Sequence, residues 1–309
     1  MTLCDASIDF ETADFRICED LSDVREAVEQ RLEMLVGTLP GVPLNLQQAV
    51  RHALLGKSKR VRPVLLYLIA EPSPRQRLCA LDLGCAVEMV HTASLILDDL
   101  PCMDDAQIRR QRPTTHIAFG QSTAILAAIG LLTRAFGIVA ELDEVPEPTR
   151  VRLAALLSDA VGWDGLVAGQ EIDVNGRQQL KNADQIEELN WLKTGVLFVA
   201  AAEMGAVLGG LEDKRLDAVR RFARHLGVAF QTADDLLDQD ASTSEAGKDV
   251  HKDGDKATLV SLFGASQARM SCQEHLSNAE SALAESGVTP APILELMQRL
   301  FATRKAAAQ

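Results

Sequence analysis

The segment LDLGCAVEMVHTASLIL, residues 81–97, restricts the possible folds of this chain more than any other feature of its sequence. It is apolar almost all round, and a helix of that kind is buried among other elements on every side. Helical periodicity continues along nearly the whole chain, whereas strand-like alternation and short runs of Val, Ile and Thr between turn signals are scarce. We therefore predict an all-α fold, a large helical bundle with this segment in its middle.

Clusters of Gly and Pro mark the breaks between the expected helices. These helices span about residues 20–37, 45–55, 60–71, 75–99, 107–111, 121–141, 148–172, 183–193, 195–210, 213–239, 256–263, 265–286 and 291–305. Because no internal repeat or low-complexity linker divides the chain, we expect one domain over residues 20–309. Residues 1–19 are expected to form a mobile tail.

Composition argues against several classes of protein. A net charge of −13 disfavours nonspecific nucleic-acid binding, which needs a basic surface. Six scattered cysteines without a CxxC pair predict a reduced, cytoplasmic protein with no zinc site. The N-terminus lacks the basic and apolar regions of a signal peptide. Arg134 interrupts the longest apolar stretch, residues 122–140, which favours a buried core helix over a transmembrane segment.

An acidic cluster follows the apolar helix. Asp98 and Asp99 stand at its end, and Asp104 and Asp105 come after a turn at Pro101. Carboxylates at a helix C-terminus are unfavourable because the helix dipole is negative there, so this pair needs cations nearby. The turn can bring Asp104 back towards Asp98. Taken alone, the cluster could equally be a solvated acidic loop.

A second acidic cluster lies on a later helix. Gln231, Asp234, Asp235 and Asp238 are spaced i, i+3, i+4 and i+7, so they share one face. Like charges at this spacing destabilise a helix unless something neutralises them. An exposed helix is the plain alternative for this segment alone. Carboxylates on two facing helices suit Mg²⁺, a hard cation that takes oxygen ligands and often shares them with substrate phosphates.

Basic residues accompany both acidic clusters. The motif GKSKRVRP places four cations within residues 57–62, near a helix start where cations are disfavoured, which indicates that they face an anion. Further candidates for contacts with phosphate are Arg109, Arg110, Lys193, Thr194, Lys248 and Lys256. Separate acidic and basic sites predict two anionic ligands, one held through Mg²⁺ and the other directly by Lys and Arg.

The ordered motifs resemble those of the trans-isoprenyl diphosphate (polyprenyl) synthases, and most of all the bacterial geranylgeranyl diphosphate synthases. The resemblance covers about residues 45–260 and rests on GKSKRVRP, EMVHTASLILDDLPCMDDAQIRRQRPTTH, GLVAGQEIDV, LKTG, FQTADDLLD and GKD…KAT. It implies an all-α bundle around a deep central cavity, usually as a homodimer. It also implies Mg²⁺-dependent condensation of isopentenyl diphosphate with dimethylallyl, geranyl or farnesyl diphosphate to give geranylgeranyl diphosphate.

The resemblance further implies which residues carry the reaction. Three Mg²⁺ ions would be bound by Asp98, Asp104 and Asp234, with support from Asp99, Asp105, Asp235 and Asp238. Isopentenyl diphosphate would contact Lys59, Arg62, His91 and Arg110. The allylic diphosphate would contact Arg109, Lys193, Thr194, Gln231, Lys248 and Lys256. The implied catalytic set is Asp98, Asp99, Asp104, Asp234, Asp235 and Lys193, with Gln170 and Asp173 lining the cavity near the metals.

Product length would depend on Ala93 and Ser94, which lie within about one and a half turns of Asp98. In the resembling family a large aromatic residue at the position of Ala93 gives farnesyl diphosphate, so alanine implies geranylgeranyl diphosphate. Alanine could also be a small packing residue. One departure from the family pattern is Asp255, which stands where the family usually has Gly before Lys256.

Four other functions share part of this pattern. A farnesyl diphosphate synthase shares every motif except the product-length position. A terpene cyclase would lack the basic motif and would usually carry more aromatic residues than 4%. A non-catalytic synthase subunit tends to lose aspartates, and both acidic clusters are intact. A di-iron bundle needs two Glu-x-x-His units, and the sequence offers only Glu88 with His91.

Overall fold

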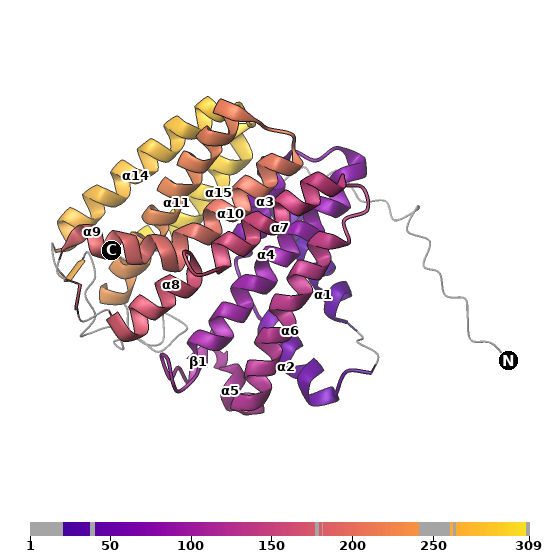
Figure 1. Cartoon of the computed structure of the whole chain (residues 1–309). Coiled ribbons are helices and arrows are strands. Elements are labelled where there is room, and N and C mark those ends of the chain that lie inside the picture. The colour runs from indigo at the N-terminus through magenta and orange to yellow at the C-terminus, as the bar shows by residue number, and fades with distance from the viewer. Residues whose placement is uncertain are drawn as a thin grey trace.

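The structure is a computed structural model, and it describes residues 21–37, 41–176, 179–180, 182–240, 260–261 and 264–306. Helices make up nearly all of this part (Figure 1), so the predicted all-α fold is confirmed. The predicted tail at residues 1–19, most of the predicted helix 256–263, and both Lys248 and Lys256 lie outside the described residues.

Most helices begin and end close to the predicted positions. The α-helices are α1 (Leu21–Val36), α2 (Leu44–Leu54), α3 (Val61–Ala70), α4 (Arg77–Asp98), α5 (Thr115–Phe119), α6 (Gln121–Ala140), α7 (Glu147–Val161), α8 (Leu166–Glu171), α9 (Ala183–Asn190), α10 (Val196–Leu208), α11 (Asp213–Asp240), α14 (Ala265–Ser286) and α15 (Pro290–Ala306). The shorter elements are the 3₁₀ turn η1 (Pro74–Gln76), the π-helical turns η2 (Ile172–Gly176) and η4 (Trp191–Gly195), and the strands β1 (Ile108–Arg109) and β2 (Arg112–Pro113).

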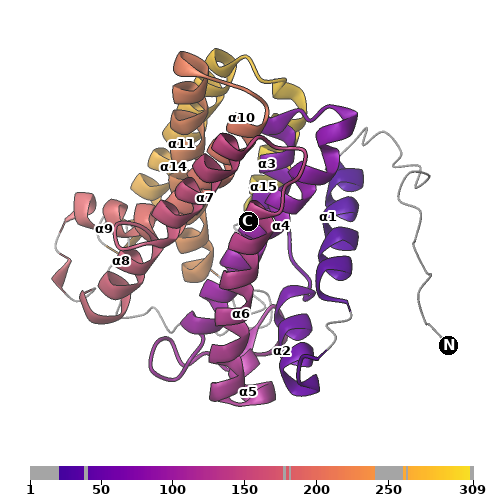
Figure 2. The ribbon, with the colours of Figure 1, turned by 45° about the vertical axis from the view of Figure 1, so that its right-hand side comes forward.

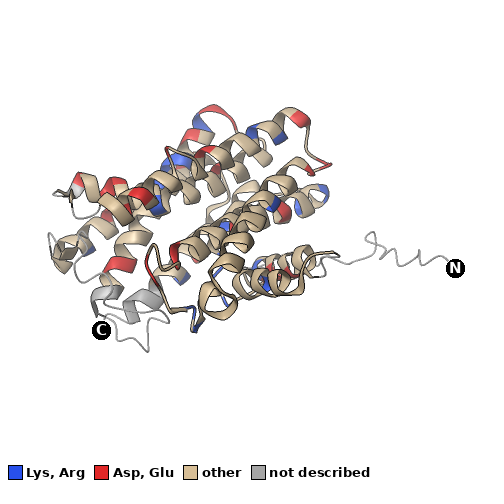
Figure 3. Ribbon diagram, turned by 60° about the horizontal axis from the view of Figure 1, so that its bottom comes forward, with Lys and Arg blue, Asp and Glu red and all other residues tan. Residues whose placement is uncertain are grey.

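Helix α4 lies in the middle of the bundle, as its apolar sequence predicts. It packs against α1, α3, α6 and α10, and it is buried along most of its length. Helices α1 and α2 lie on one side of it, whereas α11 and α14, which pack along each other, lie on the opposite side (Figure 2). In the view of Figure 3, basic and acidic residues are interspersed along the helices.

Two predicted helices are corrected by the structure. The predicted helix at residues 107–111 is instead part of the hairpin β1–β2, which spans residues 108–113 and in which Arg109 pairs with Arg112. Its turn residues Arg110 and Gln111 have φ values of 53° and 63°, the left-handed conformation that a two-residue hairpin turn requires. Residues 148–172, predicted as one helix, are divided between α7 and α8. A Cβ on Gly165 would lie 2.3 Å from the carbonyl oxygen of Ala160, so only glycine fits this break.

Helix α6 is less buried than its apolar sequence suggests. Three segments are long and apolar enough to cross a membrane by length and composition alone, Pro74–Asp98, Gln121–Ala140 and Asp184–Leu208. The fold buries 72% and 83% of the apolar windows in the first and third, but only 39% of that in α6. The prediction of a buried core helix is therefore wrong for one face of α6, where Ile125, Leu126 and Ile129 are exposed.

Candidate active site

The first acidic cluster folds back on itself at the end of α4. The backbone N–H of Asp104 donates to the carbonyl oxygen of Asp98 at 3.0 Å, and that of Asp105 donates to Leu100 at 3.1 Å. This bulge, which the turn at Pro101 predicts, brings the Asp104 carboxylate beside that of Asp98.

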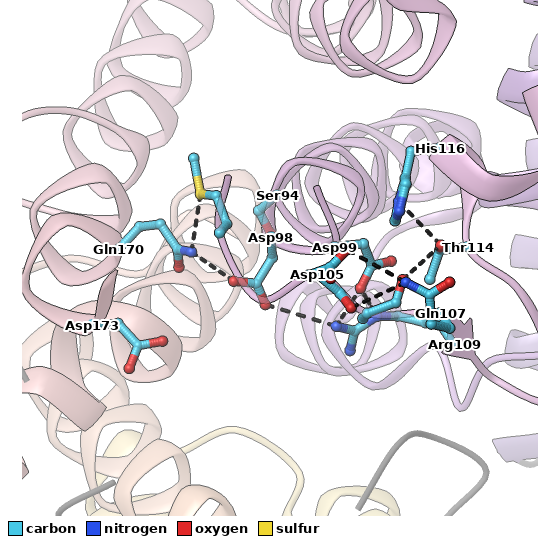
Figure 4. Close-up of polar contacts among 12 residues, drawn as sticks. Ser94, Asp98, Asp99, Asp105, Gln107, Arg109, Thr114, His116, Gln170 and Asp173 are labelled. Atoms are coloured by element: carbon cyan, nitrogen blue, oxygen red, sulfur yellow. Dashed lines mark hydrogen bonds and ion pairs between the residues drawn. The ribbon is translucent and has the colours of Figure 1, made fainter. Parts of the chain in front are cut away.

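Three carboxylates converge next to this bulge. Oxygen atoms of Asp98, Asp104 and Asp173 all lie within 4.8 Å of one another. Asp173 comes from the π-helical turn η2, and Figure 4 shows its side chain together with that of Asp98. Oxygens on opposite sides of a Mg²⁺ ion are roughly 4.2 Å apart, because each Mg–O distance is about 2.1 Å. The carboxylate group therefore fits the size and the ligand preference of Mg²⁺.

Lys193 neutralises part of this carboxylate group. Its ammonium forms an ion pair with Asp173 and lies 3.5 Å from Asp98. The Gln170 amide donates to the same Asp98 oxygen at 2.6 Å (Figure 4). Burial disfavours the charged form of Lys193, but the carboxylates of Asp98 and Asp173 outweigh it and raise its pKa. Lys193 of η4 thus supplies a cation of the kind that the sequence requires near the aspartates.

Close helix packing places Lys193 opposite Gln170. Helix α8 crosses the π-helical turn η4 so closely that a Cβ on Gly169 would lie 2.7 Å from the backbone nitrogen of Lys193. Glycine at 169 is the residue that permits this approach. The crossing sets the amide of Gln170 and the ammonium of Lys193 on the same carboxylate.

Asp99 has a different partner from Asp98. The Arg109 guanidinium donates to Asp99 Oδ1 through Nε at 2.7 Å and contacts it through Nη2 at 2.6 Å, whereas Asp98 lies 3.8 Å away (Figure 4). Burial raises the pKa of Asp99, although Arg109 opposes this. The hairpin β1–β2 thus carries its arginine back onto the end of α4, and Asp99 lies outside the metal-sized carboxylate group.

A cavity of about 440 Å³ opens beside the carboxylates. Its polar end is lined by Arg62, His91, Asp98, Gln170, Lys193 and Thr194. Its apolar walls include Val90, Leu97, Leu132, Val161, Leu166, Val167 and Leu197. Ser94 also lines the cavity, but Ala93 is fully buried and is not part of the lining. Of the two predicted product-length residues, only Ser94 faces the space that a substrate tail would occupy.

Arg62 and His91 meet at the polar end of the cavity. The Arg62 guanidinium lies 4.5 Å from the centre of the Phe198 ring, and its Nε has no hydrogen-bond partner. Burial lowers the pKa of Arg62 to about 10, so it stays charged at neutral pH. Burial, and then the charge of Arg62, lower the pKa of His91 well below its usual value. A cationic guanidinium and a neutral imidazole therefore face the cavity together.

The other two predicted contacts of isopentenyl diphosphate, Lys59 and Arg110, do not line this cavity. Arg110 lines a separate, small pocket of about 40 Å³, together with Gly56 and Arg112. The side chain of Lys59 is exposed. Arg62 and His91 are thus the two residues of this predicted set that line the cavity, and the charge of Arg110 lowers the pKa of both.

The second acidic cluster joins the site through a chain of hydrogen bonds. The Thr194 hydroxyl donates to Gln231 at 2.7 Å, and the Gln231 amide donates to Asp235 at 2.9 Å. Asp234 is half-buried on the same helix. Among the residues that the structure describes, the metal-sized carboxylate group includes Asp173 but not Asp234. The side chain of Asp238 lies outside the described part.

Arg60, one of the cations expected to face an anion, meets carboxylates of the protein itself. Its side chain is fully buried and pairs with Glu88 and Glu29. The signal available in the sequence was Glu88 itself, a carboxylate within an otherwise apolar helix that needs a buried cation.

Comparisons with known proteins agree with this arrangement. A family model described as polyprenyl synthetase matches residues 43–287. The geranylgeranyl diphosphate synthase of Pseudescherichia vulneris is 40% identical over 268 residues, 85% of each chain. The farnesyl diphosphate synthase of Geobacillus stearothermophilus is 38% identical over 84% of this chain and 91% of its own.

Solved structures of prenyl-transferring enzymes are also similar to this chain. The geranyltransferase of Helicobacter pylori, complexed with magnesium and isoprenyl diphosphate, superposes with a TM-score of 0.78 and 27% identity, over 95% of this chain and 98% of that one. Together with the family match over most of its length, this shows that the chain belongs to the polyprenyl synthetase family.

Proposed function

We propose that this protein is a Mg²⁺-dependent prenyltransferase that condenses isopentenyl diphosphate with allylic diphosphates to form geranylgeranyl diphosphate. The observation that supports it most is the cavity, whose polar end holds carboxylates, a lysine and an arginine, and whose walls are apolar. A prenyl diphosphate likewise consists of a charged diphosphate and an apolar hydrocarbon tail, which match the polar end and the apolar walls of the cavity. Burying its hydrocarbon tail is favourable by about 0.8 kcal/mol per CH₂ group.

The carboxylates would hold the metal. We assign Asp98, Asp104 and Asp234 as ligands of three Mg²⁺ ions shared with the allylic diphosphate. Bound Mg²⁺ neutralises the diphosphate and makes it a better leaving group. Lys193 and Thr194 would donate hydrogen bonds to the same diphosphate, Lys193 by moving its ammonium from the carboxylates to the phosphate oxygens.

The reaction then needs little from protein bases. The allylic C–O bond breaks and its electron pair leaves with the diphosphate. The double bond of isopentenyl diphosphate attacks the resulting allylic cation, and a proton leaves the new chain, taken up by the departed diphosphate. The apolar walls exclude water that would otherwise capture the cation. Arg62 and His91 would hold the second diphosphate at the other side of the polar end.

Replacing Arg62 by alanine is expected to raise the KM for isopentenyl diphosphate roughly ten- to hundredfold. A lost charge-assisted contact with phosphate is worth about 1.5–3 kcal/mol. The KM for the allylic substrate should change much less, because its diphosphate is assigned to the Mg²⁺ ions, Lys193 and Thr194 and not to Arg62. Initial rates measured while each substrate is varied would show this. Arg134→Ala, which removes an exposed arginine paired with Glu141, is the control and should leave both KM values unchanged. Equal changes in both KM values would contradict the two-site assignment.

We further propose that two copies of the chain pair through the exposed apolar face of α6. Ile125, Leu126 and Ile129 lie on one stretch of this helix, and Ile117 of the preceding α5 is exposed as well. Large apolar side chains that are exposed together on one helix are typical of an interface between subunits. A second copy of the same chain is the expected partner. Sedimentation as a single chain at working concentrations would refute this pairing.

A further inference from the structure

The basic motif of residues 56–62 contains one cation, Arg60, that is buried but does not line the cavity. Arg60 has a side chain with no exposed surface, and its φ of 50° is in the left-handed region. It directly precedes α3, and Arg62 follows two residues later. A bulky residue adopts this conformation only where surrounding contacts hold it.

Those contacts come from four segments of the chain. Arg60 Nη1 donates to Glu88 of α4 at 2.7 Å. Its Nε and Nη2 donate to Glu29 of α1 at 2.9 and 3.0 Å. Nη2 also donates to the carbonyl oxygens of Leu54 at 2.6 Å and Gly56 at 3.2 Å. The guanidinium therefore connects the start of the motif, the end of α2 and the helices α1 and α4.

Glu88 connects Arg60 to the cavity. It is 1% exposed and lies on α4, three residues before His91. The Ser58 hydroxyl, also in the basic motif, donates to it at 3.4 Å. Burial opposes the charge on Arg60, but Glu29 and Glu88 outweigh it and raise the pKa of Arg60. The ion pair between Arg60 and Glu88 fixes the motif that ends in Arg62 against the helix that carries His91.

A buried ion pair of this kind is weak evidence of a gain in stability. Desolvation of two charges consumes most of their attraction, and apolar replacements of similar size are often as stable. What the ion pair does supply is one fixed position of the basic motif relative to α4. Arg62 and His91 lie two and three residues from the paired side chains, and both line the cavity.

We propose that Arg60 and Glu88 are positioning residues of the isopentenyl diphosphate site, holding Arg62 and His91 at the spacing that grips one diphosphate. The inference rests on the proposed function and adds to it a pair of residues that do not touch the substrate. In this proposal, three cations of the motif face solvent or substrate, and the fourth, Arg60, holds the motif in position.

The variant Arg60→Met keeps an unbranched side chain and removes the charge. It is expected to raise the KM for isopentenyl diphosphate at least tenfold and to change the KM for the allylic diphosphate less than twofold. Glu88→Gln keeps the shape and one acceptor oxygen, so a smaller rise of two- to fivefold is expected. Arg60→Lys keeps the charge and should recover part of the loss seen in Arg60→Met.

The matched control is Arg31→Met. Arg31 of α1 forms a two-bond ion pair with Asp82 of α4 at 2.5 and 3.0 Å, and both are mostly buried. It joins the same two helices but lies outside the basic motif. This variant should lower the melting temperature while leaving both KM values within twofold of the wild type.

The outcomes separate a positioning role from a structural one. If Arg60→Met behaves as Arg31→Met does, or raises both KM values equally, the positioning role is overturned. If Arg60→Met does not fold, Glu88→Gln and Arg60→Lys decide, since a selective rise in the KM for isopentenyl diphosphate supports the role and unchanged values overturn it. A wild-type protein that consumes no isopentenyl diphosphate would overturn the proposed function and this inference together.

Discussion

Replacing Asp98 by alanine is expected to lower turnover by about a thousandfold or more while the chain stays folded. Asp98 is the carboxylate on which the site converges, because Gln170, Lys193 and Asp104 all approach it. Weakening a Mg²⁺ site removes several kcal/mol of charge stabilisation from the transition state, and about 4 kcal/mol corresponds to a thousandfold loss.

The measurement is steady-state turnover at saturating Mg²⁺, with a thermal melt of each variant. Asp82→Ala is the matched control, because it removes an ion-paired aspartate from the same helix at a distance from the carboxylate group. It should keep turnover close to that of the wild type. A fall of less than tenfold in Asp98→Ala, or a melt showing that the variant is unfolded, would contradict the assigned role.

Replacing Ser94 by phenylalanine is expected to change the main product from geranylgeranyl to farnesyl diphosphate. Ser94 lines the cavity between its polar end and its apolar walls, and its hydroxyl is already satisfied by the carbonyl oxygen of His91 at 2.8 Å. A phenyl ring there would fill the path of the growing tail. Overpacking of this kind typically costs about 1–3 kcal/mol, which the fold can tolerate.

Two further variants make the test specific. Ser281→Phe is the control, because Ser281 of α14 makes the same kind of backbone hydrogen bond on an exposed face and should leave the product unchanged. Ala93→Phe places its ring in the fully buried core behind the cavity, so a smaller shift is expected than for Ser94→Phe. Geranylgeranyl diphosphate as the main product of Ser94→Phe would show that another part of the cavity limits the tail. A wild type that stops at farnesyl diphosphate, as the name of the Geobacillus relative suggests for that protein, would point to the same conclusion.

The helices could be predicted from the sequence because each has a strong apolar pattern. Two local features escaped this reasoning. The hairpin at residues 107–111 depends on positive φ values at Arg110 and Gln111, which are not the residues that usually adopt them. The predicted break between the helices 183–193 and 195–210 is instead the π-helical turn η4, which continues one helix into the next. Helical periodicity does not reveal a π-helical turn.

The parts of the site that depend on contacts between residues close in sequence could be predicted. The parts that depend on contacts between distant segments could not. The fold-back of Asp104 onto Asp98 follows from a nearby turn. The pairing of Lys193 with Asp173 depends on how closely α8 crosses η4, which only tertiary packing decides. The inward direction of Arg60 likewise depends on Glu88, a partner 28 residues away. A run of basic residues does not say which of its members will meet a buried carboxylate.

The most direct test of the central claim is to identify the products of the purified protein. It would be incubated with Mg²⁺, isopentenyl diphosphate and, in turn, dimethylallyl, geranyl or farnesyl diphosphate, and the dephosphorylated products would be separated by chain length. Geranylgeraniol should be the main product from all three starters, and chelation of Mg²⁺ should abolish it. Hydrolysed or cyclised starter without any chain elongation would contradict the account.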